Sequence, residues 1–559
     1  MNIHLLLLPF WTPLIPPMGI SCLKSYLKKE GFEVKTRDFS MDEDLREFYN
    51  KYFSTLKDFI PARKRGNYYS IGHDVLQNQL MAHINIADDE DYREAVKELV
   101  RKTFYTELDD GAARQLTEII REFYAGLESI LLQFLEQNKP ELLGLSVYSG
   151  NLPASLFAFR LVKKKYPHIT TVMGGGIFAD QLAPGSPNLE AFLEKEKSID
   201  KIVIGEGEIL FTKFLRGELP ADKRVITLED IDRKVLDLSV VSVPDFSDFD
   251  VRNYPNMSAY TSRSCPFQCS FCSETIQWGR YRKKSAQQIV GELKELYQLY
   301  SNQLFLLSDS LLNPVINGLA EEFIKHDEAI YWDGCLRADS PVDDTEKTFL
   351  WRQGGFYRAR LGIESGSERI LDLMGKKISP DQNAAALAGL AAAGIKTTTL
   401  WVIGHPGETE EDFQQTLDFL EQMKDDIYEA ECRPFYYYLT GQVGSAEWEK
   451  DRQAYPLYSD KLANKLLLGT WVLDGIPSRE ESYGRVARFV EHCEKLGIPN
   501  PYFLHEIQAA DKRWKELHKN AVPSLIELQD KNHYIDECKY IKKLSLAADN
   551  QPEEIDFSF

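Results

Sequence analysis

Three cysteines within eight residues carry the strongest chemical signal in the sequence. Cys265, Cys269 and Cys272 stand in "TSRSCPFQCSFCSE" with a C-x3-C-x2-C spacing. Three close thiolates suit an iron-sulfur cluster that leaves one iron open. A structural zinc ion would want a fourth Cys or His, and no further Cys and no His occurs between Tyr260 and His326. A cysteine nucleophile needs no such trio. The spacing therefore favours the open-iron cluster over both alternatives.

The elements that precede this loop predict a cofactor-binding α/β domain. Buried strands are expected at "IHLLLLPF", "PELLGLSVYSG", "ITTVMGGGIFAD" and "IDKIVIGEGEIL", with helices between them. This alternation is typical of a parallel sheet covered by helices. Glycines follow several of the strands, and glycine at the carboxyl ends of strands lets a flat or anionic ligand approach the backbone. Because no G-x-G-x-x-G opens the first helix, NAD is disfavoured as that ligand.

From residue 259 a second series of about six β-α repeats predicts a partial (β/α)6 barrel. Catalytic groups of such barrels lie on the loops at the carboxyl ends of the strands, and the cysteine loop follows the first expected strand, "SAYTSRS". The expected domain organisation has five parts. These are a Rossmann-like domain at 1–221, a helical insertion within it at about 45–135, a linker at 222–258, the barrel at 259–440, and a helical C-terminal region at 441–559 whose last dozen residues are an acidic, disordered tail.

The bulk composition narrows the function classes. A net charge of -20 argues against general nucleic-acid binding. The apolar N-terminal run lacks a basic flank, and its prolines follow too soon for a membrane span, so it is interpreted as a first strand and not as a secretion signal. Eight cysteines in 559 residues are too few for a disulfide scaffold, which favours a reducing cytoplasm. Ordinary thiols are expected at the other five positions: Cys22, Cys335, Cys432, Cys493 and Cys538.

The cysteine loop and the repeats after it, roughly residues 258 to 440, resemble the radical S-adenosylmethionine (radical SAM) superfamily. The resemblance implies a [4Fe-4S] cluster on the three cysteines, whose open iron chelates S-adenosylmethionine (SAM). It also implies an electron donor such as flavodoxin or ferredoxin, and cleavage of SAM to a 5'-deoxyadenosyl radical. The implied SAM contacts are Ser308 and Asp309 for the methionyl amino group, Arg337 for its carboxylate, Glu364 and Ser365 for the ribose, and Phe271, Gly404 and Pro406 for the adenine. One departure is Ser264, because relatives usually have glycine directly before the first cysteine.

The N-terminal half, residues 1 to about 220, is similar to radical SAM enzymes that carry a cobalamin-binding domain. The cobalamin contacts implied by this resemblance lie in four segments: Pro17 and Gly19; Ser146, Tyr148, Ser149 and Gly150; Gly174, Gly175 and Gly176; and Gly205, Glu206, Gly207 and Glu208. No D-x-H-x-x-G occurs in the sequence, so no protein histidine is expected as the lower ligand of cobalt. Tyr148 is a candidate to shield that face.

The resulting hypothesis is a cobalamin-dependent methyltransferase that methylates an unactivated carbon of a peptide or secondary metabolite, as in natural product biosynthesis. Cyclisation or rearrangement, and methylation at phosphorus, remain open as alternative outcomes. A cobalamin-sensing binding protein with a structural cluster is disfavoured by the full set of expected SAM contacts. An RNA-modifying, sulfur-inserting enzyme would want a second N-terminal cysteine trio, and only Cys22 precedes Ser264. The substrate is expected to meet the insertion and the segment "RPFYYYLTGQVGSAEW".

Overall fold

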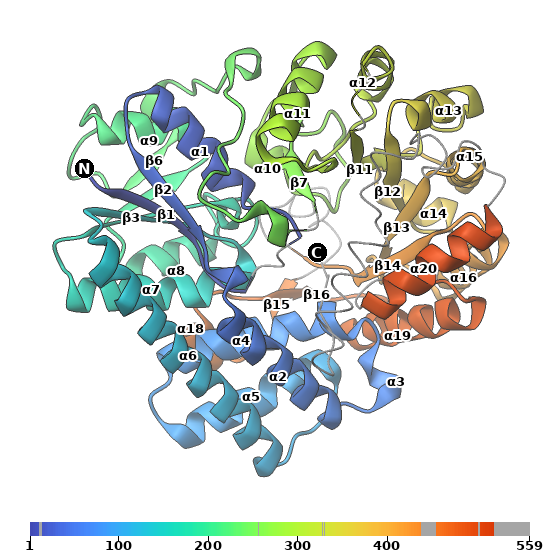
Figure 1. Ribbon diagram of the computed structural model, residues 1–559. Coiled ribbons are helices and arrows are strands. Elements are labelled where there is room, and N and C mark those ends of the chain that lie inside the picture. Colours follow the sequence, from blue (N-terminus) through green and yellow to red (C-terminus); the bar gives the residue numbers. More distant parts are fainter. Residues whose placement is uncertain are drawn as a thin grey trace. The chain divides into compact units, whose positions relative to one another are not determined.

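The structure is a computed structural model that describes residues 1–10, 14–254, 256–326, 328, 330–437, 454–500 and 504–518. The chain divides into two compact units (Figure 1). The first consists of Met1–Asp250, Ile276–Trp278 and Tyr437–Leu473. The second consists of Val251–Thr275, Gly279–Tyr436 and the described residues from Asp474 onward.

The first unit is built on a parallel six-stranded sheet with the strand order β2-β1-β3-β4-β5-β6. Its strands are β1 (Ile3–Leu7), β2 (Val34–Asp38), β3 (Leu142–Ser146), β4 (Thr170–Gly174), β5 (Lys201–Ile204) and β6 (Val225–Thr227). Every residue of β1 and β5 is buried, whereas β2 alternates buried and exposed residues. Continuous apolar runs of this kind are typical of parallel strands that are covered on both faces.

Four helices connect and cover these strands: α1 (Met18–Lys29), α7 (Leu152–Lys165), α8 (Pro187–Lys195) and α9 (Gly207–Leu215). Leu5 of β1, Ile20 of α1 and Phe211 of α9 belong to one buried apolar cluster. The order of elements confirms the predicted α/β class of this half. The segment 222–258, expected to be a linker, instead begins with β6, which pairs with β5. Only three residues long, β6 is too short for its apolar pattern to be recognised in the sequence.

The insertion between β2 and β3 forms five helices, which gather as a layer of their own (Figure 1). They are α2 (Glu43–Phe59), α3 (Ala62–Arg65), α4 (Tyr68–Asn85), α5 (Asp89–Phe104) and α6 (Asp110–Asn138). Asp42, Asp88 and Asp109 cap α2, α5 and α6 by accepting backbone N–H bonds. The ring of Phe10, just after β1, lies 5.2 Å from that of Tyr49 in α2 and 4.9 Å from that of Phe123 in α6. The insertion therefore packs against the carboxyl end of β1.

A late segment of the chain also belongs to the first unit. It contains β15 (Ala454–Pro456), α18 (Asp460–Leu466) and β16 (Trp471–Leu473), and the two strands pair antiparallel. The region beyond residue 440 was expected to be helical, so this small sheet is an addition to that prediction. The side chain of Asn188 and the backbone of Gly469 exchange two hydrogen bonds, of 3.1 and 2.7 Å. Lys461 pairs with Asp91 of α5 at 2.8 Å.

The second unit contains a parallel six-stranded sheet with the order β14-β13-β12-β11-β10-β7. Its strands are β7 (Met257–Ala259), β10 (Leu304–Leu307), β11 (Tyr331–Arg337), β12 (Phe356–Glu364), β13 (Lys396–Ile403) and β14 (Glu429–Pro434). The helices of this unit are α11 (Ala286–Tyr300), α12 (Ile316–Phe323), α13 (Thr345–Gln353), α14 (Glu368–Leu373), α15 (Pro380–Ala392), α16 (Glu410–Met423), α19 (Arg479–Leu496) and α20 (Leu504–Leu517). Six parallel strands in sequential order, connected by helices, confirm the predicted partial barrel.

The cysteine loop leaves the sheet after β7. It is bounded by a two-stranded antiparallel ribbon, β8 (Ser262–Arg263) and β9 (Arg282–Lys283), and contains the short helix α10 (Glu274–Trp278). Among the described residues, no helix is both long and apolar enough to cross a membrane.

Candidate functional site

The backbone of the cysteine loop is held by a few hydrogen bonds. The amide of Cys272 donates to the carbonyl of Cys269 (3.1 Å), and the amide of Ser270 donates to the carbonyl of Met374 just after α14 (2.9 Å). All three thiols are partly exposed. Burial raises the pKa of Cys272 to about 12 and also raises that of Cys265. These two thiols are therefore protonated at neutral pH until a metal displaces their protons.

Ser264, where the resemblance to radical SAM enzymes leads us to expect glycine, has a φ of 74°. This is the left-handed region, which glycine adopts freely and other residues rarely do. The hydroxyl of Ser264 donates to the carbonyl of Gly279 at 2.6 Å, at the far end of the loop. The left-handed backbone explains why glycine suits this position. In this chain, the hydrogen bond from Ser264 to Gly279 offsets part of the strain that a residue with a Cβ adds.

Asp309, two residues after the end of β10, anchors the start of the loop. Its carboxylate accepts the amides of Thr261 and Ser262 and both of their hydroxyls, with distances of 2.8 Å to the amide of Thr261 and to the hydroxyl of Ser262. Burial raises the pKa of Asp309 to about 6, although these donors favour the charged form. The neighbouring Ser308 shares a 3.0 Å hydrogen bond with Ser258 of β7. Ser308 and Asp309, both predicted to contact SAM, thus connect the end of β10 to β7 and to the start of the cysteine loop.

Arg337, the last residue of β11, contacts the loop directly. Its Nη1 lies 3.6 Å from the sulfur of Cys269, within reach of an N–H···S hydrogen bond, and its guanidinium lies 4.1 Å from the centre of the Phe267 ring. Its Nε pairs with Asp339 at 2.9 Å. Arg337 is buried. Arg337, which was predicted to bind the carboxylate of SAM, therefore lies beside the three cysteines.

At the end of β12, Glu364 has a φ of 65° and pairs with the buried Lys376 at 2.5 Å. The ammonium of Lys376 lies 6.0 Å from the ring of Phe271. Lys376 therefore lies between Glu364, at the end of β12, and Phe271 of the cysteine loop. Lys376 was missed at the sequence level because it follows a short helix and has no local signal. Ser365 shares a 3.2 Å hydrogen bond with Thr416 of α16.

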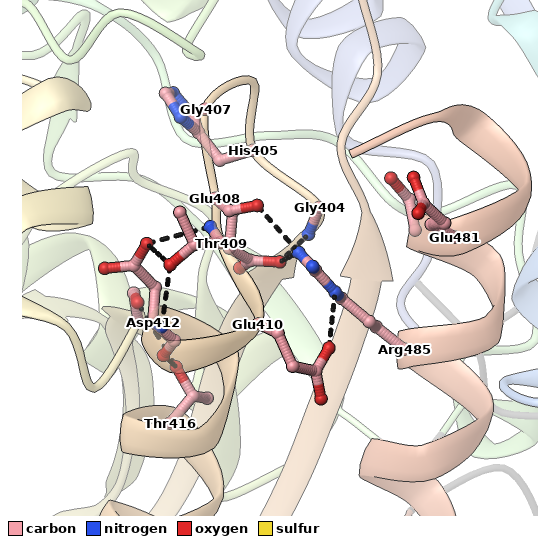
Figure 2. A network of polar contacts seen from close by, with 12 residues as sticks. Gly404, His405, Gly407, Glu408, Thr409, Glu410, Asp412, Thr416, Glu481 and Arg485 are labelled. Atoms are coloured by element: carbon pink, nitrogen blue, oxygen red, sulfur yellow. Dashed lines mark hydrogen bonds and ion pairs between the residues drawn. The ribbon is translucent and has the colours of Figure 1, made fainter. Parts of the chain in front are cut away.

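The turn between β13 and α16 contains Gly404 and Pro406, the residues expected near the adenine. Gly404 has a φ of 78°, and its amide donates to the carboxylate of Glu408 at 3.0 Å (Figure 2). Glu408 is fully buried and pairs with Arg485 of α19 at 2.8 Å. Burial raises the pKa of Glu408 to about 7, against the stabilising effect of the guanidinium. The sequence did not indicate Glu408 and Arg485, which are 77 residues apart.

The donor set at the loop fits a cluster better than a single ion. A mononuclear zinc site gathers four ligands at ~2.0–2.3 Å from one metal. The loop supplies three thiols, and the sequence has no further Cys and no His between Tyr260 and His326 to serve as a fourth ligand. A [4Fe-4S] cluster can be held by three thiolates, each on its own iron, with the fourth iron open. The partly exposed thiols and the cationic Arg337 beside them are compatible with a [4Fe-4S] cluster.

In the first unit, several loops at the carboxyl ends of β1, β3 and β4 approach one another closely. A Cβ added to Gly176 would lie 2.8 Å from the ring of Tyr148, and one on Gly175 would lie 2.5 Å from the backbone of Val147. A Cβ on Gly150 would lie 2.9 Å from the carbonyl of Phe10. These contacts leave no room for a Cβ, so the three glycines allow the loops at this edge of the sheet to pack closely together.

Tyr148 is the central side chain of this edge. Its hydroxyl would lie 3.7 Å from a Cβ on Gly19, and its hydrogen-bond partner is Ser146. Burial raises the pKa of Tyr148, so the phenol is neutral. Ser149 donates to Asp180 at 3.2 Å.

The other predicted cobalamin contacts have different surroundings. A carboxylate oxygen of Glu206 accepts the amide of Leu236 at 3.1 Å, and Glu208 is buried within α9. A Cβ on Gly205 would meet Leu228, and one on Gly207 would meet Leu23. Gly174 ends β4, and Pro17 directly precedes α1.

Some of the predictions fall on residues that the structure does not describe. Of the expected substrate segment, residues 433–437 are described and 438–448 are not. The predicted acidic tail and Cys538 also lie outside the described residues. Cys432 and Cys493 are buried, and Cys22 and Cys335 are half-buried.

Comparison with known proteins places this geometry in a family context. Residues 260–420 match the model of the Radical SAM superfamily. The chain is 26% identical over 320 residues to an anaerobic magnesium-protoporphyrin IX monomethyl ester cyclase of Rubrivivax gelatinosus, a match that covers 52% of this chain and 55% of the cyclase. It is 24% identical over 378 residues to an uncharacterized methyltransferase of Pyrococcus horikoshii, covering 63% of this chain and 76% of that protein. The chain thus spans about half the length of the cyclase and about three quarters of the length of the methyltransferase.

The fold as a whole is similar to a solved radical SAM structure. The methyltransferase TsrM from Kitasatospora setae, determined with cobalamin and a [4Fe-4S] cluster bound, superposes with a TM-score of 0.60 at 15% sequence identity. The match covers 93% of this chain and 99% of TsrM. Residues 260–420 therefore carry the sequence features of the Radical SAM superfamily, and the fold of the chain is similar to that of TsrM.

Proposed function

We propose that the chain is a cobalamin-dependent radical SAM methyltransferase that methylates an unactivated carbon of a small molecule or peptide. The observation that carries this proposal is the cysteine trio on a loop after a strand of the partial barrel, beside the cationic Arg337. The glycine-lined loop edge of the first unit supports the cobalamin part. Methyltransferase-named relatives and the fold of TsrM support the reaction class.

In this proposal the three cysteines bind the cluster, and the residues around them hold its loop in shape. When bound, the cluster and SAM supply a carbon radical able to take hydrogen from an unactivated carbon. Asp309 fixes the loop entry through Thr261 and Ser262, and Ser264 ties the entry to Gly279. Arg337 places positive charge next to the sulfur of Cys269. Glu364 with Lys376, and the turn at Gly404, supply polar groups for the ribose and adenine of SAM.

The first unit would hold cobalamin over its glycine-lined edge, and bound cobalamin would supply the methyl group. Tyr148 and the backbone at Gly175 and Gly176 would lie against the corrin ring. A neutral phenol at this place excludes water without offering a charged ligand to cobalt. Electrons would come from an external donor such as a flavodoxin or ferredoxin.

Ring closure is the second candidate reaction, because a relative in the comparison is named a cyclase. Both reactions can begin with hydrogen removal by the same radical, so the groups around the cluster do not separate them. They differ in whether a methyl group enters the product.

The decisive experiment is anaerobic purification with cobalamin supplied, followed by optical spectra and by iron, sulfide and cobalt counts. We expect about four irons and about one cobalt per chain. Cobalt well below stoichiometry would remove the cobalamin proposal and leave the radical chemistry standing. A variant with Cys265, Cys269 and Cys272 changed to Ala is expected to form no 5'-deoxyadenosine. With a methyl-labelled SAM, label recovered in the product supports methylation, and its absence from a turned-over product supports ring closure.

A further inference from the structure

The turn that follows β13 is held by a helix from beyond the family match. Residues 260–420 match the radical SAM model, whereas α19 begins at Arg479. The chain just before this helix and the helix itself contact the turn at Gly404, Gly407 and Glu408 (Figure 2). All of these residues belong to the second unit.

The contacts at Gly404 and Gly407 involve the backbone. A Cβ added to Gly404 would lie 2.3 Å from the hydroxyl of Ser482, so the first turns of α19 pack directly on this glycine. The amide of Gly407 donates to the carbonyl of Ile476 at 2.6 Å. A change in the path of the turn at these two points would require α19, or the segment just before it, to move as well.

The contact at Glu408 is a buried ion pair. Nη1 of Arg485 donates to the carboxylate of Glu408 at 2.8 Å and to its backbone carbonyl at 2.9 Å. The same carboxylate oxygen accepts the amide of Gly404. Glu408 is 0% exposed and Arg485 7% exposed. A guanidinium that binds both the side chain and the backbone of one residue fixes the curvature of the turn. Removing one partner would leave the other charge buried without compensation.

Other charged groups near this pair include Glu410, Asp412, Arg488 and Glu481, and the last of these, on α19 itself, accepts the amide of Ser478. Nε of Arg485 lies 3.5 Å from Glu410, which pairs mainly with the more exposed Arg488 at 2.6 Å. Asp412 faces the opposite side of the turn, where it accepts from Thr409 and Arg369. Arg485 is therefore the cation that enters the turn from α19, and Arg488 is a neighbour on the same helix that does not.

We propose that α19 is a functional part of the SAM site, with Arg485 as a positioning residue that holds the turn from Gly404 to Thr409 in the form that binds the adenine of SAM. The inference rests on the proposed function, which assigns this turn to the adenine. It adds that a helix outside the family match determines the affinity for SAM. Arg485 acts through Glu408 and need not touch SAM.

The test compares Arg485→Gln with Arg488→Gln in the full-length, cluster-reconstituted protein. Both variants lose one arginine from the same helix, but only the first loses the contacts to the turn. We expect Arg485→Gln to weaken SAM binding, measured by equilibrium dialysis, by about tenfold or more, which is about 1.4 kcal/mol. Its iron content should remain normal. Raising the SAM concentration should restore the rate of 5'-deoxyadenosine formation, so that KM changes more than kcat. Arg488→Gln should bind SAM like the wild type.

A further variant protects the test against misfolding. Arg485→Lys keeps the positive charge but has one nitrogen on a shorter side chain, so it cannot contact both Glu408 and Glu410, and an intermediate loss of SAM affinity is expected. Wild-type affinity in both Arg485 variants, or an equal loss in Arg488→Gln, would overturn the inference. A wild-type protein that assembles a cluster but neither binds nor cleaves SAM would instead refute the proposed function itself.

Discussion

The backbone at Ser264 leads to a prediction in which the usual ranking of alanine and glycine is reversed. With a φ of 74°, a residue that carries a Cβ costs roughly 1–2 kcal/mol relative to its normal conformation. The hydrogen bond to Gly279 offsets about 0.5–1.5 kcal/mol of this cost. Ser264→Ala keeps the strain and loses the bond. Ser264→Gly also loses the bond but relieves the strain.

The net difference between the two variants can be worked out from these terms. Glycine recovers about 1–2 kcal/mol of strain and gives back roughly 0.5–1 kcal/mol in the unfolded chain, because it has more conformational freedom there. The loop should therefore be more stable in Ser264→Gly than in Ser264→Ala by about 1 kcal/mol, or roughly a factor of five in its opening equilibrium. Where φ is negative, a glycine variant is usually less stable than the alanine variant at the same position.

Hydrogen exchange followed by mass spectrometry measures this opening in peptides that span residues 259–284. Peptides from Ser264→Ala should exchange about fivefold faster than those from Ser264→Gly. Ser270, in the same loop but without a positive φ, is the matched control position, and there the glycine variant should exchange faster than the alanine variant. If alanine protects the loop at position 264 as well as glycine does, the strain argument is wrong.

Three further predictions concern single residues. The pKa of Asp309 is raised to about 6, against an ordinary value of 3.8 in the unfolded chain. The contribution of Asp309 to the free energy of unfolding is therefore complete below pH 3.8 and is lost as the pH rises through about 6. The melting temperature of the wild type relative to Asp309→Asn should therefore fall between pH of about 4 and about 7, and a difference independent of pH would contradict this. Arg337→Gln should lower the reduction potential of the cluster in an EPR-monitored titration without SAM, because a cation beside the sulfur of Cys269 favours the reduced form; an unchanged potential would show that the contact has no electronic effect. Gly176→Ala should reduce bound cobalt per chain, because the added Cβ meets the ring of Tyr148, whereas Tyr148→Phe, which keeps the ring, should retain cobalt.

The sequence allowed the architecture to be predicted because both sheets are parallel. Parallel strands are buried on both faces, so β10 appears as an unbroken apolar run followed by the polar Ser308 and Asp309, and β1 is apolar except for His4. The three residues of β6 are too few to give such a signal. The β15–β16 pair is also made of three-residue strands, whose residues are half-buried or exposed.

The partners of the site residues could not be predicted in the same way. Asp309 was recognised by its place after a strand, but the donors that occupy its carboxylate come from residues 47 and 48 positions away. The pairing of Glu364 with Lys376, and of Glu408 with Arg485, depends on which helix returns to which strand end. A position along the chain indicates that a side chain reaches the edge of a sheet, and only the three-dimensional structure shows what it meets there.

The path of the chain between the two units has a consequence for biosynthesis. The described residues 454–473 return to the first unit, where Gly469 binds Asn188 and Lys461 pairs with Asp91. During translation, the N-terminal residues of the first unit would therefore leave the ribosome before the rest of that unit has been synthesised. We expect the first unit to complete its folding only after the barrel strands and residues 454–473 have been synthesised. A fragment of residues 1–250 should in that case be more sensitive to protease than the same residues in the full chain.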